Sequence, residues 1–433
     1  MLKNREYETT VLNTVSLHII PFVFILYIVA FLDRVNLGYA AVTMNQDLGI
    51  PIELFGFLSG IFFIGYILFE VPSNLIMRRV GARVWIARIL ISWGLIAIAT
   101  GFVQDSFQVI ILRFFLGIAE AGFFPGMIWY LGTWFPPRRI AHSIALFMSA
   151  IGVSNVIGAP VSLFIIDTIH WFGIAGWRWL FILEGIPAVL LGILSFWVLK
   201  NSPRDVTWLN ENQKSWLLKE INSGRNEDSP HKRLIDILID RRVLICSVAY
   251  FAMSVGLYAI IFFLPTIAKK LLPDQNLSAV GIILVAVYGI ALLSMILVSK
   301  NSDRTGERRY HTATALIVGG IGLLIDHLFI DSVISLIGVS IALAGIFSMY
   351  GPFWSYILAF LSEDEQPAGV AAINSIGNTG GFVGPMITGA IIALYGSIDS
   401  AWVIIAAILC IGGVMILFVE RVGKHHSRCR DTS

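Results

Sequence analysis

The sequence contains little charge. Only 13% of its 433 residues are Asp, Glu, Lys or Arg, whereas an ordinary soluble protein carries about 25%. Together with a hydrophobic content of 57%, this scarcity excludes a soluble globular fold. The 30 basic and 28 acidic residues nearly cancel, so the net charge of +2 indicates no particular partner. We therefore expect an integral protein of the lipid bilayer.

Cysteine is equally scarce. Cys246, Cys410 and Cys429 are too few and too far apart for a disulfide framework, a CxxC pair or a thiolate metal site. The His425–His426 pair has no further ligands nearby, and no glycine-rich stretch has the GxxxxGK[ST] form of a phosphate-binding loop. We accordingly expect no metal, no cofactor and no nucleic acid partner. Because the helices contain no nucleophile–base set, we also expect no enzyme activity.

Long apolar runs, by contrast, are abundant. A helix needs about 20 apolar residues to cross the bilayer, because its backbone groups must be hydrogen-bonded inside the hydrocarbon. Twelve windows meet this requirement: 17–39, 54–77, 84–103, 107–131, 142–166, 179–199, 243–267, 277–299, 312–330, 332–361, 369–394 and 400–420.

One long polar segment, 200–242, divides the twelve windows six and six. We predict an all-α membrane protein with one six-helix bundle in 1–199 and a second bundle with a tail in 243–433. Trp216 and Leu217 in the connecting loop predict a short amphipathic helix along the membrane surface.

Basic residues concentrate in alternate connections. The 200–242 loop alone holds nine, while the opposite connections together hold only three. Because positive residues stay on the cytoplasmic side during insertion, both termini are predicted to be cytoplasmic. The first apolar run ends in the charged AFLDRVN rather than in a small-residue cleavage site, so we expect the first helix to be retained.

The two halves repeat each other at a fixed offset of 225 residues. The offset relates Pro160 to Pro385 and Trp177 to Trp402. It also relates the loop RRVGAR to the loop DRTGER through three matched pairs: Arg79 and Arg304, Gly81 and Gly306, Arg83 and Arg308. Agreement without gaps in three places indicates a duplication, and hence two bundles related by a pseudo-twofold axis along the membrane normal.

Together these features resemble the major facilitator superfamily over essentially the whole chain. The resemblance implies that the two loops gate a central cavity on the cytoplasmic side, through Arg79, Gly81 and Arg83 in the first and Asp303, Arg304, Gly306 and Arg308 in the second. Arg78 stands where the family carries an acidic residue. In the family that acid helps to hold the cytoplasmic gate closed. Here this contact is therefore expected from the second copy of the loop or from other residues.

Charged side chains stand out within the predicted helices of the N-terminal half: Asp33, Arg34, Glu70, Arg88, Arg113, Glu120 and Glu184. Each costs about 2.5–3.5 kcal/mol at mid-bilayer, so each needs a partner, a water-filled cavity or a function. For Glu70 and Glu184 a structural role is the simpler interpretation. Arg88 lies one turn into its helix, so it can extend to the membrane surface.

Arg113 and Glu120 are seven residues apart, so they lie on one face of their helix. With the adjacent pair Asp33 and Arg34 they offer two acids that can take a proton and two guanidiniums that can hold a carboxylate. The alternative is a pair of structural salt bridges that tie the first and fourth membrane helices together.

Three motifs are similar to the anion:cation symporter branch of the superfamily, which moves organic acids with protons: AFLDRVN, Tyr66 and RFFLGIAEAGFFPG. The resemblance implies that Asp33 and Glu120 are the proton-titrating acids. It also implies that Arg34 holds the substrate carboxylate, that Tyr66 contributes a hydroxyl, and that Arg113 partners Glu120.

The C-terminal half offers neutral groups. Asn374 matches the Asn with which the branch contacts substrate, and Asn378 lies one turn further on the same face. The 225-residue offset places Tyr258 opposite the charged pair of the first helix. We predict substrate contacts for all three, with interhelical hydrogen bonding or packing as the alternative. Tyr350 and Trp354 either stack on the substrate or belong to the core.

We therefore expect a secondary transporter that imports a small organic carboxylate with protons, by rocking two bundles about a central cavity. Ile151 stands where sugar-acid members of the branch carry Gln, which favours tartrate-like or aromatic acids. One chain in the bacterial plasma membrane should suffice. The alternatives are an exporter or antiporter, and a membrane sensor with the same fold.

Overall fold

The computed structural model describes residues 2–222, 234–329, 332–361 and 365–419. Cys429, the His425–His426 pair and the basic residues of the C-terminal tail lie outside these ranges. Within them, all regular secondary structure is helical, as predicted.

Eight α-helices form the first half: α1 (Leu2–Asp47), α2 (Ile52–Val80), α3 (Ala82–Thr100), α4 (Ser106–Glu120), α5 (Phe123–Gly132), α6 (Pro137–Met148), α7 (Ala150–Thr168) and α8 (Gly176–Val198). Two short helices follow, α9 (Glu211–Asn222) and α10 (Leu234–Leu238). Six more form the second half: α11 (Arg241–Leu271), α12 (Leu277–Thr305), α13 (Arg309–Leu328), α14 (Ser335–Phe360), α15 (Gln366–Tyr395) and α16 (Asp399–Ile416).

Twelve helical stretches of the described chain are long and apolar enough to cross a membrane, which confirms the predicted number. Two of the predicted windows are each built from two helices. In 107–131 the break between α4 and α5 falls at Gly122, whose φ of 83° is left-handed and suits glycine. In 142–166 the α6 and α7 helices meet at Ser149.

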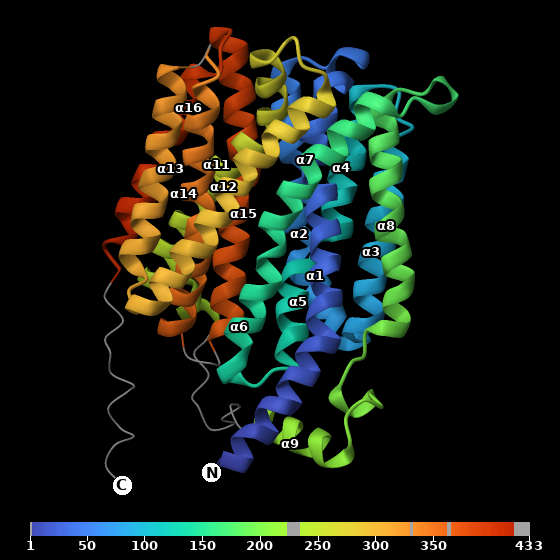
Figure 1. Cartoon of the computed structure of the whole chain (residues 1–433), viewed down its shortest axis with the longest axis vertical. Helices are drawn as coiled ribbons and strands as arrows, with labels where there is room; N and C mark the ends of the chain where they lie inside the picture. The colour runs from blue at the N-terminus through green and yellow to red at the C-terminus, as the bar shows by residue number, and fades with distance from the viewer. Residues whose placement is uncertain (1, 223–233, 330–331, 362–364, 420–433) are drawn as a thin grey trace.

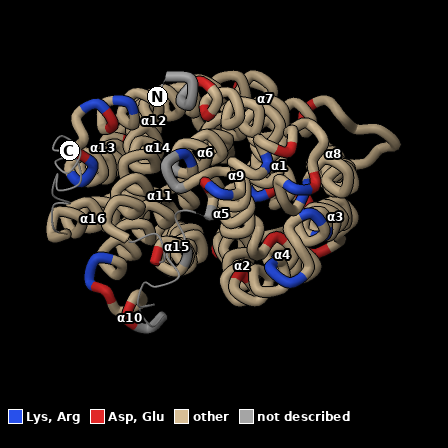
Figure 2. The backbone as a smooth tube through the Cα atoms, turned by 90° about the horizontal axis from the view of Figure 1, so that it is seen from below, with Lys and Arg blue, Asp and Glu red and all other residues tan. Residues whose placement is uncertain are grey.

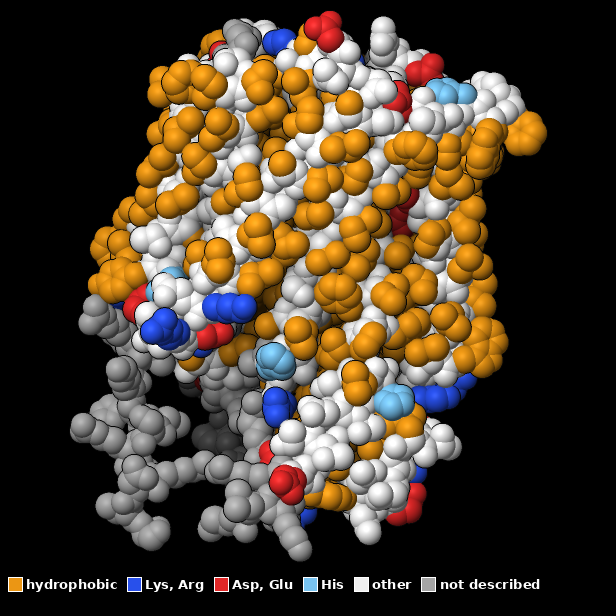
Figure 3. Space-filling view, viewed as in Figure 1, with side chains coloured by type: hydrophobic (Ala, Val, Ile, Leu, Met, Phe, Trp, Pro, Cys, Tyr) orange, Lys and Arg blue, Asp and Glu red, His pale blue; other side chains and the backbone are white. Residues whose placement is uncertain are grey.

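The helices form two bundles that stand side by side, α1–α8 in one and α11–α16 in the other (Figure 1). We call the side on which α1 begins the terminal side and the opposite side the far side. Lys and Arg residues lie on the terminal side, near α9, α10 and α12 (Figure 2). Hydrophobic side chains cover most of the face seen in Figure 3 between the two sides, and this apolar surface suits lipid contact.

The internal repeat recurs in the backbone. Gly81 and Gly306, which the offset relates, both have positive φ, 95° and 68°, and both end the second helix of their half. Trp177 and Trp402 are both buried in the first turn of the last helix of their half. Matching residues thus occupy matching places, as a duplication requires.

The α9 helix is amphipathic, but its apolar side packs on the protein instead of lying free along the membrane surface. Leu217 is fully buried, and Trp216 makes an edge-to-face contact with Tyr7 of α1 at 6.0 Å between ring centroids. Trp208, just before α9, stacks on His18 at 4.2 Å. These contacts cover the terminal part of α1.

Candidate functional site

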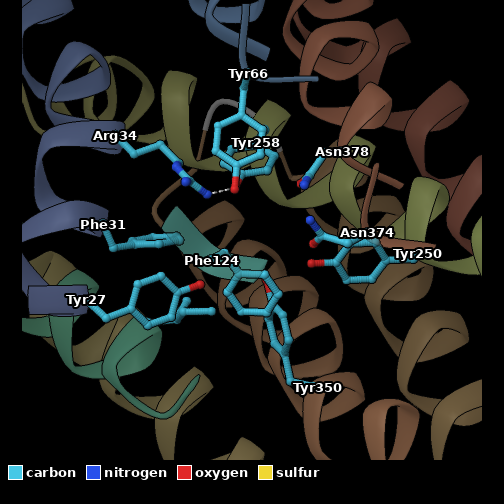
Figure 4. Close-up of a pocket in the computed structure, with 11 residues that line it drawn as sticks. Tyr27, Phe31, Arg34, Tyr66, Phe124, Tyr250, Tyr258, Tyr350, Asn374 and Asn378 are labelled. Atoms are coloured by element: carbon cyan, nitrogen blue, oxygen red, sulfur yellow. Dashed lines mark hydrogen bonds between the residues drawn. The ribbon is translucent and has the colours of Figure 1, made fainter. Parts of the chain in front are cut away.

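A small cavity lies between the two bundles (Figure 4). It is lined by eleven residues from both halves: Tyr27, Phe31, Arg34, Tyr66, Phe124, Ile151, Tyr250, Tyr258, Tyr350, Asn374 and Asn378. All five residues expected to contact substrate are in this set. Five tyrosines and two asparagines make the lining polar but uncharged, apart from one guanidinium.

The α1 helix contributes Tyr27, Phe31 and Arg34, which follow the i, i+4, i+7 spacing of one helix face. Tyr27 and Phe31 were not among the expected residues. Their spacing from Arg34 is the signal that could have identified them, since it is the spacing that joins Arg113 to Glu120.

Arg34 connects three helices and is only 6% exposed. Its guanidinium forms a hydrogen-bonded ion pair with Glu120 of α4. It also donates to the hydroxyl of Tyr258 on α11, at 3.3 Å, and so reaches the other bundle (Figure 4). The rings of Phe62 and Tyr66 on α2 each lie 5.4 Å from it, within cation–π range.

Asp33 is buried beside the cavity without lining it. One of its carboxylate oxygens accepts a hydrogen bond from the indole Nε1 of Trp93 on α3, at 2.7 Å. The other oxygen, Oδ1, has no hydrogen-bond partner in the described structure. The two adjacent charges of α1 therefore face different surroundings, Arg34 the cavity and Asp33 the interior of the first bundle.

The expected pairing of Arg113 with Glu120 is not what the structure contains: Glu120 pairs with Arg34. Arg113 is 1% exposed, and none of its three guanidinium nitrogens has a hydrogen-bond partner among the described residues. It lies against the ring of Phe62 at 5.2 Å. The α2 and α4 helices approach closely here: at Gly117 an added Cβ would lie 2.0 Å from the carbonyl oxygen of Phe62.

Glu70 proves to link the bundles. It is 2% exposed, and its carboxylate accepts hydrogen bonds from Asn374 Nδ2 at 2.8 Å and from Ser375 Oγ at 2.6 Å, both on α15. Asn374 thus lines the cavity and at the same time makes the interhelical hydrogen bond that was its alternative interpretation. Asn378 lines the cavity one turn further along α15.

The aromatic pair of α14 divides between the two interpretations. Tyr350 lines the cavity. Trp354 packs behind it, 5.3 Å from the ring of Tyr250 and 6.4 Å from that of Phe124, and so belongs to the core. Tyr250 and Phe124 were not expected in the lining: no motif marks Tyr250, and Phe124 lies in the RFFLGIAEAGFFPG motif without an assigned role.

The two loops expected to gate the cavity make contacts within their own bundles. Asp303 forms an ion pair with Arg308 at 2.9 Å, in the second loop. In the first loop, the backbone N–H of Arg83 donates to Asn201 Oδ1 at 3.0 Å. Arg79, Gly81, Arg304 and Gly306 lie at the terminal ends of α2 and α12, at or next to the helix end.

Contacts between the bundles enclose the cavity on both sides. On the terminal side they include the hydrogen bonds to Glu70. On the far side Asp167 of α7 accepts a hydrogen bond from Ser278 Oγ of α12 at 2.6 Å. Gly56 of α2 lies so close to Pro385 and Gly389 of α15 that an added Cβ would be 2.5 Å from the first of them.

A closed cavity between two membrane-spanning bundles, with side chains from both, is the architecture of a transporter that exposes its site to each side in turn. The family model described as "Major Facilitator Superfamily" matches residues 23–325 and 271–429. The chain belongs to this superfamily, and it is a secondary transporter rather than an enzyme.

Individual relatives agree. The chain is 42% identical over 426 residues, 98% of both proteins, to a protein of Agrobacterium vitis named "Putative tartrate transporter". It is 33% identical over 406 residues, 94% of both, to "Inner membrane transport protein RhmT" of Escherichia coli (strain K12). The xylose transporter XylE of E. coli, in a partially occluded inward-open conformation, has the same fold, with a TM-score of 0.72, 17% identity and coverage of 95% and 98%.

Proposed function

We propose that this protein imports a small hydroxylated carboxylate, of the size of tartrate, together with protons. The observation that carries the proposal is the position of Arg34, which is the one charged group in the cavity lining and is paired with the buried acid Glu120. An anion site and a proton site therefore share one guanidinium.

Arg34 couples the two ligands. While Glu120 is ionised, its carboxylate occupies the guanidinium that the substrate needs. A proton on Glu120 removes this competitor, and Arg34 can then hold a substrate carboxylate with two parallel hydrogen bonds. Proton binding and anion binding favour each other, which is the thermodynamic condition for symport.

Asp33 and Arg113 complete the proton-coupling set. Asp33 has one unpartnered oxygen that can take a second proton. Arg113 supplies a fixed positive charge that interacts electrostatically with both Glu120 and Asp33. The expected partnership of Arg113 and Glu120 is therefore one of charge without a hydrogen bond.

The substrate class follows from the lining. Hydroxyls of Tyr66 and Tyr258 and the amides of Asn374 and Asn378 suit the hydroxyl groups and second carboxylate of a small hydroxy acid. Ile151 lines the cavity at the position where sugar-acid symporters carry Gln. The name of the A. vitis relative supports tartrate as the first compound to test.

The terminal side is proposed to be cytoplasmic, because the basic loops lie there. The name of the RhmT relative supports a place in the inner membrane of a bacterium. On this orientation the loops with Arg79, Arg83, Asp303 and Arg308 are hinges at the cytoplasmic ends of the bundles. One chain is expected to transport by itself, since it supplies the whole cavity lining.

Uptake of labelled tartrate into proteoliposomes tests the proposal. An inward proton gradient should drive accumulation that a protonophore abolishes, and Asp33→Asn or Glu120→Gln should lose accumulation. Accumulation that needs no gradient, or gradient-driven accumulation that survives in both variants, would contradict proton coupling. Efflux driven by the same gradient would identify an antiporter instead.

A further inference from the structure

A further buried acid lies deep in the first bundle, outside the cavity. Glu184 of α8 is 7% exposed, and its Oε1 accepts a hydrogen bond from Ser162 Oγ of α7 at 2.6 Å. Its other oxygen, Oε2, has no hydrogen-bond partner in the described structure. One hydroxyl is a weak reason to keep an ionisable group inside a membrane-spanning bundle, because an amide would satisfy the serine equally well.

Glu184 lies on the far side of Asp33. Asp47 at the far end of α1 accepts a hydrogen bond from Trp177 at the start of α8, at 2.8 Å, so these two residues mark a common level. With a rise of about 1.5 Å per residue, Asp33 lies roughly 20 Å below that level and Glu184 roughly 10 Å below it. Asn36, one turn beyond Asp33 on α1, falls between them.

Unpartnered polar atoms connect the two acids. Both side-chain amide atoms of Asn36 lack a hydrogen-bond partner, as do Asp33 Oδ1, Glu184 Oε2 and the hydroxyl of Tyr39. Glu184 interacts electrostatically with Tyr39 and Asp33 and lies close enough to Asn36 for a hydrogen bond to form, as Tyr39 does to Tyr288. Buried polar atoms are nearly always hydrogen-bonded, so it is unusual that this many unpartnered atoms lie close together. The two carboxyl groups can each bind a proton, and the amide and the hydroxyl can each hydrogen-bond a water molecule.

We propose that Glu184 is a third proton-binding site, which takes up protons from the far side and passes them to Asp33. The inference rests on the proposed proton coupling. A proton binds Glu184 at Oε2 and leaves for Asp33 Oδ1 through hydrogen bonds in the region of Asn36. Glu184 returns to its ionised form, and no other reactant takes part.

The charged and titratable groups around this path come from several helices. They are Asp33 and Tyr39 of α1, Arg113 and Glu120 of α4, and Tyr288 of α12. Glu184 is not among the residues that line the cavity, so it can be changed without altering the lining.

The test compares Glu184→Gln with wild type in proteoliposomes that contain a pH-sensitive dye. Gln can still accept the hydrogen bond from Ser162 but cannot bind a proton at this site. Exchange of internal for external tartrate without a gradient should stay within twofold of wild type. Gradient-driven accumulation and tartrate-dependent proton uptake should fall at least tenfold.

Two control variants keep the test sharp. Glu184→Asp retains a titratable group and should recover most of the proton uptake. Asp326→Asn changes a buried acid of the second bundle that also accepts a hydrogen bond from a serine, Ser335, and should leave uptake unchanged. If Glu184→Gln lost exchange together with proton uptake, or lost neither, Glu184 would be structural.

The outcomes separate this inference from the proposed function. If wild-type protein moves tartrate without any proton flux, proton coupling fails, and the third proton site fails with it. If wild type is coupled and Glu184→Gln is coupled to the same degree, only the proposal for Glu184 is wrong.

Discussion

Arg34 is held in the cavity by three kinds of contact: an ion pair with Glu120, a hydrogen bond to Tyr258, and the faces of two aromatic rings. The ion pair stays inside the first bundle, whereas the hydrogen bond crosses to the second. A substrate that takes over the guanidinium must therefore alter a contact within one bundle and a contact between the two. This is how binding at one residue can influence the arrangement of the whole molecule.

Tyr258→Phe tests the crossing contact. The change removes the hydroxyl that accepts from Arg34 while it leaves the ring and the ion pair in place. In the proposed site this hydroxyl also contacts tartrate, and a hydrogen bond to a charged group contributes about 1.5–3 kcal/mol, so its loss should raise the KM for tartrate about tenfold or more with kcat within twofold. Uptake kinetics measure both values. Tyr395→Phe, at a tyrosine that is 70% exposed, is the matched control, and an unchanged KM in Tyr258→Phe would contradict the role.

Arg113→Met tests the unpaired guanidinium. A buried charge without a hydrogen-bonded partner is costly, and its replacement by an apolar side chain of similar length removes that cost. We expect a higher melting temperature for the purified variant but at least a tenfold loss of gradient-driven accumulation, because the charge near Glu120 and Asp33 is gone. Arg113→Lys keeps a positive charge and should retain more of the coupling. A variant as well coupled as wild type would exclude Arg113 from the mechanism.

At the scale of helices, the sequence predicts most of the fold because the bilayer restricts the choices. Each backbone crossing must be helical, so length and hydropathy are enough to find all twelve spans. The helix breaks at Gly122 and Ser149 could not be found in this way, because both fall inside continuous apolar windows. A glycine close to Pro125 is a signal for the first break, and no comparable signal marks the second.

The site was predictable only in part, for a related reason. Motif positions led to Arg34, Tyr66 and Asn374, the 225-residue offset led to Tyr258, and helix spacing led to Asn378; all five line the cavity. Pairing between helices depends on how closely the helices approach and on their rotation, which no single-helix pattern contains. The ion pair of Glu120 with Arg34 and the hydrogen bond from Asn374 to Glu70 are therefore visible only in three dimensions.

Glu70→Ala tests the link between α2 and α15. Loss of the acceptor for Asn374 and Ser375 should weaken closure on the terminal side, since two hydrogen bonds between the bundles disappear. The measurement uses a background without the native cysteines and spin labels at Ile76 and Ile376, two exposed positions on these helices. A larger share of the molecules should show a long distance between the two labels.

The same change frees the Asn374 amide, so tartrate should bind more tightly while transport slows. Glu53→Ala, at an exposed acid near the far end of the same helix, is the control and should change neither quantity. Distances identical to wild type in Glu70→Ala would show that other contacts hold the terminal side closed.

For the molecule as a whole, the contacts between α2 and α15 differ on the two sides of the cavity. On the terminal side a carboxylate accepts two hydrogen bonds, which protonation or substrate can alter. On the far side α2 and α15 meet backbone to backbone at Gly56 and Gly389, where close packing leaves no space for a side chain. Alternating access requires both closures to open in turn, and each can be disturbed independently.

Gly56→Ala should hold the far side open. Its Cβ would lie 2.5 Å from the Pro385 carbonyl oxygen and 3.0 Å from Gly389 Cα, and both are backbone atoms that cannot turn away. We expect transport to fall at least tenfold while stabilisation by tartrate persists. Labels at Glu53 and Leu394 should move apart.

Gly289→Ala, in a helix position with open space around it, makes the same chemical change and should be harmless. Alanine favours helix over glycine by about 1 kcal/mol. A loss of transport in Gly56→Ala alone would therefore come from the clash of the added Cβ and not from a weakened helix. Equal transport in the two variants would mean that the glycine contact is not part of the gate.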